Sequence, residues 1–218
     1  MSDQPAMLPT ASSSHPRTDE EKQVIINNAA AAYEKYLDAL GFDWRNDPNS
    51  ANTPKRVAKA FVNDIASGCY NSPPDVTAFP SDGYDGIVAQ TGIPVVSLCS
   101  HHHMSFTGVA HVAYIPSVDG KVVGLSKLNR IVEYYARRPQ IQEGLVLQVH
   151  NAIAEICEGN QGIAVIIKAQ HTCACNRGVK HQGCAMITSK LSGDFMSDDK
   201  TRNEFYQFVN MWESSAHR

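Results

Sequence analysis

The sequence has no long apolar run, no strong excess of one charge and no internal repeat. None of its segments approaches the roughly 20 apolar residues that span a bilayer, so we expect no membrane contact. The first residues lack the charged-then-apolar pattern of an export signal, which favours a cytoplasmic protein. A net charge of −3 and a pI near 6.3 argue against a nucleic-acid partner. A site for an anion must therefore be built from a local cluster of Lys and Arg.

Cysteine is scarce, and the chain has only 6 in 218 residues. They are Cys69, Cys99, Cys157, Cys173, Cys175 and Cys184. An even number suggests disulfides in short secreted chains, but in a chain of this size without an export signal it favours metal binding or burial. Cys157 lies in a helical pattern and Cys69 beside a glycine, so we interpret both as inert small hydrophobic residues.

The hydrophobic pattern predicts a tail, a helical region and a main domain. Residues 1–20 are rich in Ser, Pro, Thr and Asp and are predicted to be disordered. Residues 21–90 are interpreted as an N-terminal helical region with a connecting loop, and 91–218 as the catalytic domain. Apolar spacing predicts helices at 21–40, 53–65, 125–137, 141–156 and 200–212. Strands are predicted at 93–99, 107–116, 163–173 and 183–191. This order indicates an α+β fold with an antiparallel sheet and helices on one face.

Two short segments carry residues that bind metals. The first, at 99–102, reads Cys-Ser-His-His, and the second, at 171–173, reads His-Thr-Cys. Two thiols and an imidazole at one point form a three-ligand zinc site with an open position for water, typical of catalytic zinc. Side chains two apart on a strand share a face, so His171 and Cys173 can face one site, and Cys175 competes with Cys173. His103 and His111 are interpreted as structural or solvent-facing.

Six ordered motifs resemble those of the GTP cyclohydrolase I family. They are TPKRVAK at 53–59, CSHH at 99–102, AYIP at 113–116, GLSKLNRIV at 124–132, RPQIQE at 138–143 and HTCACNRG at 171–178. The resemblance extends over residues 20–210. It implies a tunnelling fold (T-fold), in which strands from several subunits close into a barrel. It further implies a homodecamer of two stacked pentamers with active sites at the subunit interfaces.

The resemblance also implies a reaction: GTP and water become 7,8-dihydroneopterin triphosphate and formate. The guanine five-membered ring opens at C8, the ribose rearranges, and a six-membered ring closes. This is the first step of tetrahydrofolate and other pterin biosynthesis, or of deazaguanine biosynthesis. Zinc can lower the pKa of a bound water molecule from 15.7 to about 7, which makes a nucleophile available at neutral pH.

The resemblance assigns roles residue by residue. Cys99, His102 and Cys173 are expected to hold one Zn²⁺ per subunit. His101 and His171 are expected to move protons, and Ser126 to act near the ribose. Gln142 and Glu143 are expected to hold the guanine, because a carboxylate matches its adjacent N–H and NH₂ donors. The triphosphate is assigned to Lys127, Arg130 and Arg177, with Arg56 and Lys59 added from a neighbouring subunit.

The chain departs from the family pattern beside the expected metal site. Ser100 stands where the family usually has an acidic residue, and His103 where an apolar residue is common. Cys175 and Asn176 also differ, but no expected ligand is lost. Two alternatives remain at this point: another tunnelling-fold pterin or deazapurine enzyme, and an inactive zinc-containing oligomer that binds nucleotides. Retention of His101, Gln142, Glu143 and His171 as a set favours the cyclohydrolase.

Overall fold

The computed structural model describes residues 6–216, and the chain divides into two compact units, Met1–Ser72 and Pro73–Arg218. The division precedes Pro73, whereas the sequence placed the start of the main domain at residue 91. Part of the predicted connecting loop is strand: β1 covers Ala78–Pro80, and β2 begins at Val88. Within the described residues, no helix combines the length and the apolar character needed to cross a membrane.

The first unit consists of helices with a small core of their own. They are α1 (Asp19–Ala39), α2 (Thr53–Ala60), the π-helical turn η1 (Phe61–Ile65) and α3 (Ser67–Tyr70). A capping box begins α1: the Thr18 hydroxyl accepts the Glu21 N–H, and the Glu21 carboxylate accepts the Thr18 N–H. Ile26, Ala58 and Val62 form the buried centre of this unit.

The segment before α1 has defined contacts in this unit. The His15 N–H donates to the Cys69 carbonyl and the Arg17 N–H donates to the Tyr70 carbonyl, both at 2.8 Å. The Arg17 guanidinium also donates to the Ala6 carbonyl. His15 and Arg17 therefore tie this segment to α3, although the sequence predicted disorder for 1–20. Residues 1–5 lie outside the described residues. Backbone hydrogen bonds need no apolar periodicity, so the composition of this segment gave no sign of them.

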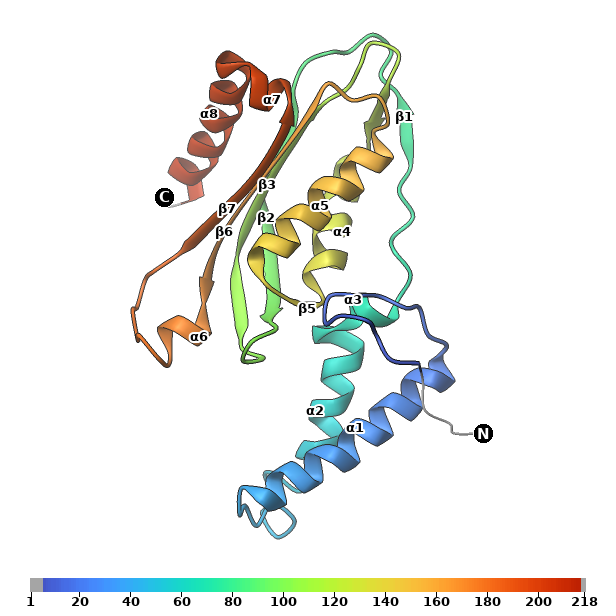
Figure 1. The fold of residues 1–218 in the computed structure, drawn as a ribbon, viewed down its shortest axis with the longest axis vertical. Helices are drawn as coiled ribbons and strands as arrows, with labels where there is room; N and C mark the ends of the chain where they lie inside the picture. Colours follow the sequence, from blue (N-terminus) through green and yellow to red (C-terminus); the bar gives the residue numbers. More distant parts are fainter. Residues whose placement is uncertain (1–5, 217–218) are drawn as a thin grey trace. The chain divides into compact units, whose positions relative to one another are not determined.

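The second unit is built on a sheet of strands in the order β5-β2-β3-β6-β7. Their bounds are β2 Val88–Cys99, β3 Ser105–Ile115, β5 Pro139–Gln140, β6 Gly162–His171 and β7 Met186–Gly193. All pairs are antiparallel except the short β2–β5 pair. A separate small sheet pairs β1 with β4 (Lys121–Val123). Figure 1 shows the long strands of the main sheet side by side.

Helices cover both faces of this sheet, not one face as the sequence predicted. Helices α4 (Leu125–Ala136) and α5 (Gln142–Ile156) share a core with Val112 and Tyr114 of β3. The next residues, Ala113 and Ile115, pack instead with Phe195 and Phe205. These two aromatic residues come from α7 (Asp194–Ser197) and α8 (Asp199–Ala216), on the other side of the sheet in Figure 1. Because β3 is apolar on both faces, both faces need cover.

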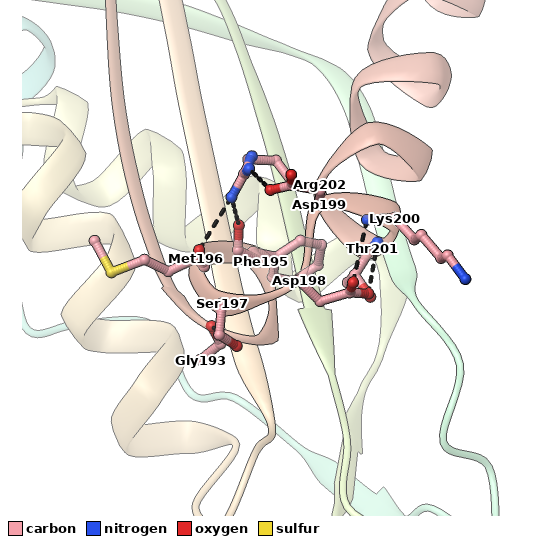
Figure 2. A network of polar contacts seen from close by, with 9 residues as sticks. All are labelled: Gly193, Phe195, Met196, Ser197, Asp198, Asp199, Lys200, Thr201 and Arg202. Carbon is pink, nitrogen blue, oxygen red and sulfur yellow. Dashed lines mark hydrogen bonds and ion pairs between the residues drawn. The ribbon is translucent and has the colours of Figure 1, made fainter.

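The start of α8 is held by side chains that satisfy free backbone groups (Figure 2). The Asp198 carboxylate accepts the N–H of Thr201 at 3.0 Å and that of Lys200 at 3.3 Å, as an N-cap does. The Arg202 guanidinium donates to the carbonyls of Phe195 and Met196, at 3.3 and 3.0 Å. The two helices α7 and α8 are thereby joined into one corner over the sheet.

Candidate active site around a Cys–His–Cys cluster

Three metal-binding side chains meet at one end of the main sheet. Cys99 is the last residue of β2, His171 is the last residue of β6, and Cys173 lies in the short helix α6 (Thr172–Cys175). Both β2 and β6 run antiparallel to β3, so their carboxyl ends lie at the same end of the sheet. One ligand atom from each of the three residues lies within 4.8 Å of the others. The two halves of the predicted constellation therefore meet.

Cys173 reaches the cluster from a helical turn and not from a strand. The sequence placed it on a strand that continues to residue 173, but β6 ends at His171. The Thr172 hydroxyl donates to the Ser105 carbonyl at 2.7 Å and ties the start of α6 to the start of β3. Cys175 is not part of this group, and its Sγ lies 3.8 Å from the Sγ of Cys184. Of the two competing thiols, Cys173 is the one that lies with Cys99 and His171.

The histidine run lies in the turn between β2 and β3. The Cys99 N–H donates to the Met104 carbonyl, and the His103 N–H donates to the Cys99 carbonyl, each at 2.9 Å. His103 has a positive φ of 50°. The side chains of His101 and His102 are exposed. Among the described residues, the group that includes both thiols contains His171 and not His102, so the assignment of His102 as a metal ligand stays a prediction.

Gln142 links the cluster to two strands. Its Nε2 donates to the Ile167 carbonyl at 3.0 Å, the Met186 carbonyl at 3.1 Å and the Thr188 hydroxyl at 2.9 Å. Its Oε1 lies 2.9 Å from Nε2 of His171. The acceptors around the NH₂ group fix the amide orientation, and a carbonyl oxygen can only accept. Nε2 of His171 therefore carries the proton, which leaves the lone pair of a neutral ring on Nδ1.

The imidazole of His171 is fixed by a ring contact on its face, in addition to the hydrogen bond between Nε2 and Gln142. Its ring stacks on Phe106, with centroids 4.5 Å apart and planes 9° from parallel. Phe106 is its partner in the β3–β6 register. Burial lowers the pKa of His171, and the nearby Glu143 carboxylate opposes that shift. The ring is thus fixed in place and favours its neutral form, which is the form that binds metals or accepts protons.

The surroundings of the Cys173 thiol oppose its ionisation. Burial raises the pKa of Cys173, and the adjacent Cys99 raises it further. A divalent cation between the thiols would reverse this effect, since a coordinated thiol is deprotonated. Two sulfurs with an imidazole nitrogen form a donor set that suits Zn²⁺ better than Mg²⁺ or Ca²⁺. The chemistry of the residues present therefore fits a zinc ion.

Residues predicted to bind substrate lie on α4 and α5. Glu143 is exposed in the first turn of α5, beside the buried Gln142. Ser126 and Arg130 are exposed on α4, and the Lys127 ammonium group donates to the Asp75 carbonyl at 2.8 Å. The expected roles of Glu143, Lys127 and Arg130 stay predictions. Gln142 differs, because its amide is engaged by the sheet and by His171.

The remaining basic residues lie in different surroundings. Arg177 is exposed directly after α6. Arg56 and Lys59 are exposed on α2, in the first unit. Arg138 is buried, and its guanidinium lies 4.5 Å from the ring centre of Tyr134. It thus serves the packing of α4 and does not add to a surface for phosphate.

Three contacts at the site were not anticipated. They are the stacking of Phe106 on His171, the bond from Thr172 to Ser105, and the proximity of Cys184 to Cys175. The stacking of Phe106 on His171 follows from the strand register, because the two residues are partners across β3 and β6. The other two depend on where the chain leaves β6, and the apolar pattern of the strand does not specify that point.

Comparisons with known proteins identify the family of this chain. The family profile described as GTP cyclohydrolase I matches residues 29–210. The GTP cyclohydrolase 1 of Streptomyces avermitilis is 47% identical over 83% of this chain and 89% of its own. The Mycolicibacterium vanbaalenii enzyme is 40% identical over 92% of this chain and 98% of its own. The Pseudoalteromonas translucida enzyme is 42% identical over 84% of this chain and 98% of its own.

A solved structure, an archaeosine synthase QueF-Like in its apo form, is 18% identical with a TM-score of 0.41. It covers 50% of this chain and 94% of that one, a likeness too weak to bear on function. The profile match and the three relatives extend over most of the chain and confirm the resemblance of its motifs. This chain belongs to the GTP cyclohydrolase I family.

Proposed function

We propose that this protein is a GTP cyclohydrolase I, which converts GTP and water into 7,8-dihydroneopterin triphosphate and formate. The observation that carries the proposal is the cluster of Cys99, His171 and Cys173, with ligand atoms within 4.8 Å, in a chain 47% identical to a GTP cyclohydrolase 1. The product belongs to tetrahydrofolate and other pterin biosynthesis, or to deazaguanine biosynthesis. A cytoplasmic location fits such an enzyme.

The cofactor in this proposal is one Zn²⁺ per chain, held by Cys99 and Cys173 with a histidine. His171 lies with the thiols in the structure, and the family pattern assigns His102. When bound, Zn²⁺ supplies Lewis-acid activation of water at neutral pH. If His102 is the ligand, the turn at 100–104 brings its imidazole to the thiols on metal binding, and His171 is left to handle protons.

His171 is proposed to accept and return a proton at Nδ1. Its Nε2–H is committed to Gln142, so Nδ1 carries the lone pair of the neutral ring. Burial favours that neutral form, which can act as a base near neutral pH. Gln142 then acts as a positioning residue, because its own amide is engaged with Ile167 and Thr188. His101, exposed in the adjacent turn, is the second proton carrier assigned by the family pattern.

Substrate recognition is assigned, from the family pattern, to residues of α4 and α5, to Arg177 and to two basic residues of the first unit. The Glu143 carboxylate accepts the N1–H and exocyclic NH₂ of guanine, a pair of donors that adenine lacks. Lys127, Arg130 and Arg177 bind the triphosphate, and Ser126 lies near the ribose. Arg56 and Lys59 come from a neighbouring subunit. This last assignment requires an oligomer, and we propose the T-fold homodecamer of the family, with strands of several subunits closed into a barrel.

The test is an assay of purified full-length protein, loaded with Zn²⁺, for formate and for the fluorescent pterin obtained after oxidation. Cys99→Ser and His171→Ala are the test variants, and His15→Ala, an exposed histidine in the first unit, is the matched control. We expect both products from the wild type and the control. Both are lost in the test variants and after chelation.

Absence of formate from folded, zinc-loaded protein would refute the proposal and favour a nucleotide-binding oligomer without turnover. Formate without the pterin would place the block after ring opening. A different product from GTP would favour another tunnelling-fold pterin or deazapurine enzyme.

A further inference from the structure

A second pair of thiols lies beside the cluster and has no role in the proposed reaction. The Sγ atoms of Cys175 and Cys184 are 3.8 Å apart, which is contact distance for two sulfur atoms. Cys175 is buried and Cys184 is half-buried, so one thiol of the pair is reachable from solvent. Neither belongs to the group of Cys99, His171 and Cys173.

The backbone keeps this pair together without a covalent bond. The His181 N–H donates to the Ala174 carbonyl at 3.3 Å, and the Gln182 side-chain amide donates to the Cys175 carbonyl at 2.8 Å. Positive φ angles at Gly178 (64°), Lys180 (53°) and Gly183 (78°) turn the chain back on itself. Residues 176–183 thus form a closed loop whose two ends are the two cysteines.

Other thiols of the chain are placed differently. Burial raises the pKa of Cys157 to about 11, so it stays protonated and unreactive at neutral pH. Cys69 is buried in the first unit, where its Sγ lies 3.6 Å from the Ala11 carbonyl oxygen. Cys99 and Cys173 face the site of the metal. Outside the group of Cys99, His171 and Cys173, the described cysteines therefore contain one close pair with an accessible member, Cys175 and Cys184.

We propose that Cys175 and Cys184 form a reversible disulfide with a low-molecular-weight disulfide, such as oxidised glutathione, as the oxidant. The Cys184 thiolate attacks one sulfur of the oxidant, forms a mixed disulfide and releases one small thiol. The Cys175 thiolate then attacks the Cys184 sulfur and releases the second small thiol. The two cysteines lose two electrons and two protons, and the oxidant gains them.

The geometry needs only a small adjustment for this bond. A disulfide requires an S–S distance of about 2.05 Å, so the sulfurs approach each other by roughly 1.8 Å. The loop of residues 176–183 is exposed throughout, so it can follow this movement. Arg177 lies within it, and oxidation therefore constrains the residue assigned to the triphosphate. This consequence, a higher KM for GTP in the oxidised protein, rests on the proposed function; the disulfide itself does not.

The experiment exposes full-length, zinc-loaded protein to increasing ratios of oxidised to reduced glutathione. Free thiols are then alkylated, and tryptic peptides are identified by mass spectrometry. Cleavage after Lys168, Arg177, Lys180 and Lys190 places Cys175 and Cys184 in different peptides, 169–177 and 181–190. We expect these two peptides to be linked, with a loss of two hydrogen atoms, and dithiothreitol to separate them. Fragment ions distinguish Cys175 from Cys173, which lies in the same peptide.

Two variants test the order of the steps. Cys184→Ser is expected to abolish the link and to leave GTP turnover of the reduced protein unchanged. Cys175→Ser is expected to stop at a glutathione adduct on Cys184. Alkylation of both cysteines under excess oxidant, or a link from Cys173 in place of Cys175, would overturn the proposal. A linked pair in a protein whose reduced form shows no GTP turnover would support this inference and refute the proposed function. Turnover by the reduced protein without any link after oxidation would do the reverse.

Discussion

The side chain of Gln142 determines how the His171 ring presents itself, and this can be tested by substitution. Gln142→Leu removes the acceptor of the Nε2–H and frees the ring to change tautomer. Loss of a partner that orients a catalytic histidine typically costs about 10–100-fold. We therefore expect kcat for GTP to fall by about that factor while KM changes little, measured by formate release.

Gln148→Leu is the matched control for this prediction. Gln148 lies on the same helix and donates to Gln140 Oε1 at 2.8 Å and to the Gly144 carbonyl at 3.2 Å, away from His171. We expect Gln148→Leu to lower the free energy of unfolding without a comparable loss of kcat. Equal losses of kcat in both variants would indicate damage to α5 and would contradict a positioning role for Gln142.

The sequence pointed to the two cysteines of the cluster, with His102 as the expected third ligand and His171 as a proton carrier. It gave no sign of the hydrogen bonds of Gln142. Cys99, His171 and Cys173 carry side chains that few other chemistries explain, and strand ends at one sheet edge bring them together. The hydrogen bonds of Gln142 reach carbonyls of Ile167 and Met186, which are fixed only when β6 and β7 are paired. A polar residue whose partners are backbone atoms of other strands leaves no pattern in its own segment.

Helix α8 closes over a bulge in β2, where Gly92 is the critical residue. The register between β2 and β3 shifts between Gln90 and Ile93, and Gly92 has a φ of 71°. A Cβ at this position would lie 2.2 Å from the Trp212 ring. We expect Gly92→Ala to lower the free energy of unfolding by about 2 kcal/mol or more, from strain and displacement of α8.

Urea unfolding measures this effect, and Gly144→Ala is the control. Gly144 lies inside α5, and a Cβ there meets nothing closer than 3.7 Å. Alanine is the better helix former, so this variant should gain roughly 0.5–1 kcal/mol. Gly92→Ala as stable as the wild type would show that α8 does not need Trp212 against the bulge.

The same contact predicts a loss of stability in acid. His111 is buried beside Trp212, with ring centroids 5.2 Å apart, and burial lowers its pKa from 6.5. Glu213 opposes this shift and Lys168 adds to it. The unfolded chain therefore binds more protons once the pH falls below about 6.5. The contribution of His111 to stability is present above that pH and is lost as the pH falls through its lowered folded-state pKa.

Urea unfolding at about pH 7.5 and about pH 5.5 tests this sign. The wild type should be less stable at the lower pH. The free energy of unfolding of His111→Asn should fall by less than that of the wild type between the higher and the lower pH. His150 is also buried with a lowered pKa, because burial outweighs its hydrogen bond to Asn151, so part of the dependence should remain. A pH dependence that is equal in both proteins would contradict the assignment to His111.

The elements were predicted well from apolar spacing, and their placement was predicted less well. The α8 pattern at 200–212 marked a helix, observed at Asp199–Ala216. Its position opposite α4 and α5 depends on β3, where Ala113 and Ile115 point away from Val112 and Tyr114. The apolar pattern of β3 does not show whether helices cover one face of the sheet or both faces. The sequence therefore did not decide between these two arrangements.

The chain as a whole consists of two units that have separate cores. The core of the first unit consists of Ile26, Ala58 and Val62. The larger clusters around Tyr114 and Phe205 lie in the second unit. Motifs in both units identified the family, because each is a local run of residues. The boundary at Ser72 was missed because 70–90 is rich in Pro, Gly and Asp, which suggested a loop, although β1 and the start of β2 pair within the second unit.

This division predicts that metal binding and GTP turnover can be separated. Cys99, His171 and Cys173 all lie in Pro73–Arg218, together with the sheet that positions them. A fragment of residues 73–218 should therefore fold and hold one Zn²⁺ per chain, measured by elemental analysis and circular dichroism. It lacks Arg56 and Lys59, so GTP turnover should fall sharply.

Two further proteins make this comparison decisive. In the full chain, Arg56→Ala with Lys59→Ala should raise KM for GTP and leave the Zn²⁺ content unchanged, because both residues act on the triphosphate in our proposal. In the fragment, Cys99→Ser should lose the metal without loss of the sheet. A folded fragment without Zn²⁺ would mean that the cluster needs the first unit. Full turnover by the fragment would exclude Arg56 and Lys59 from the active site.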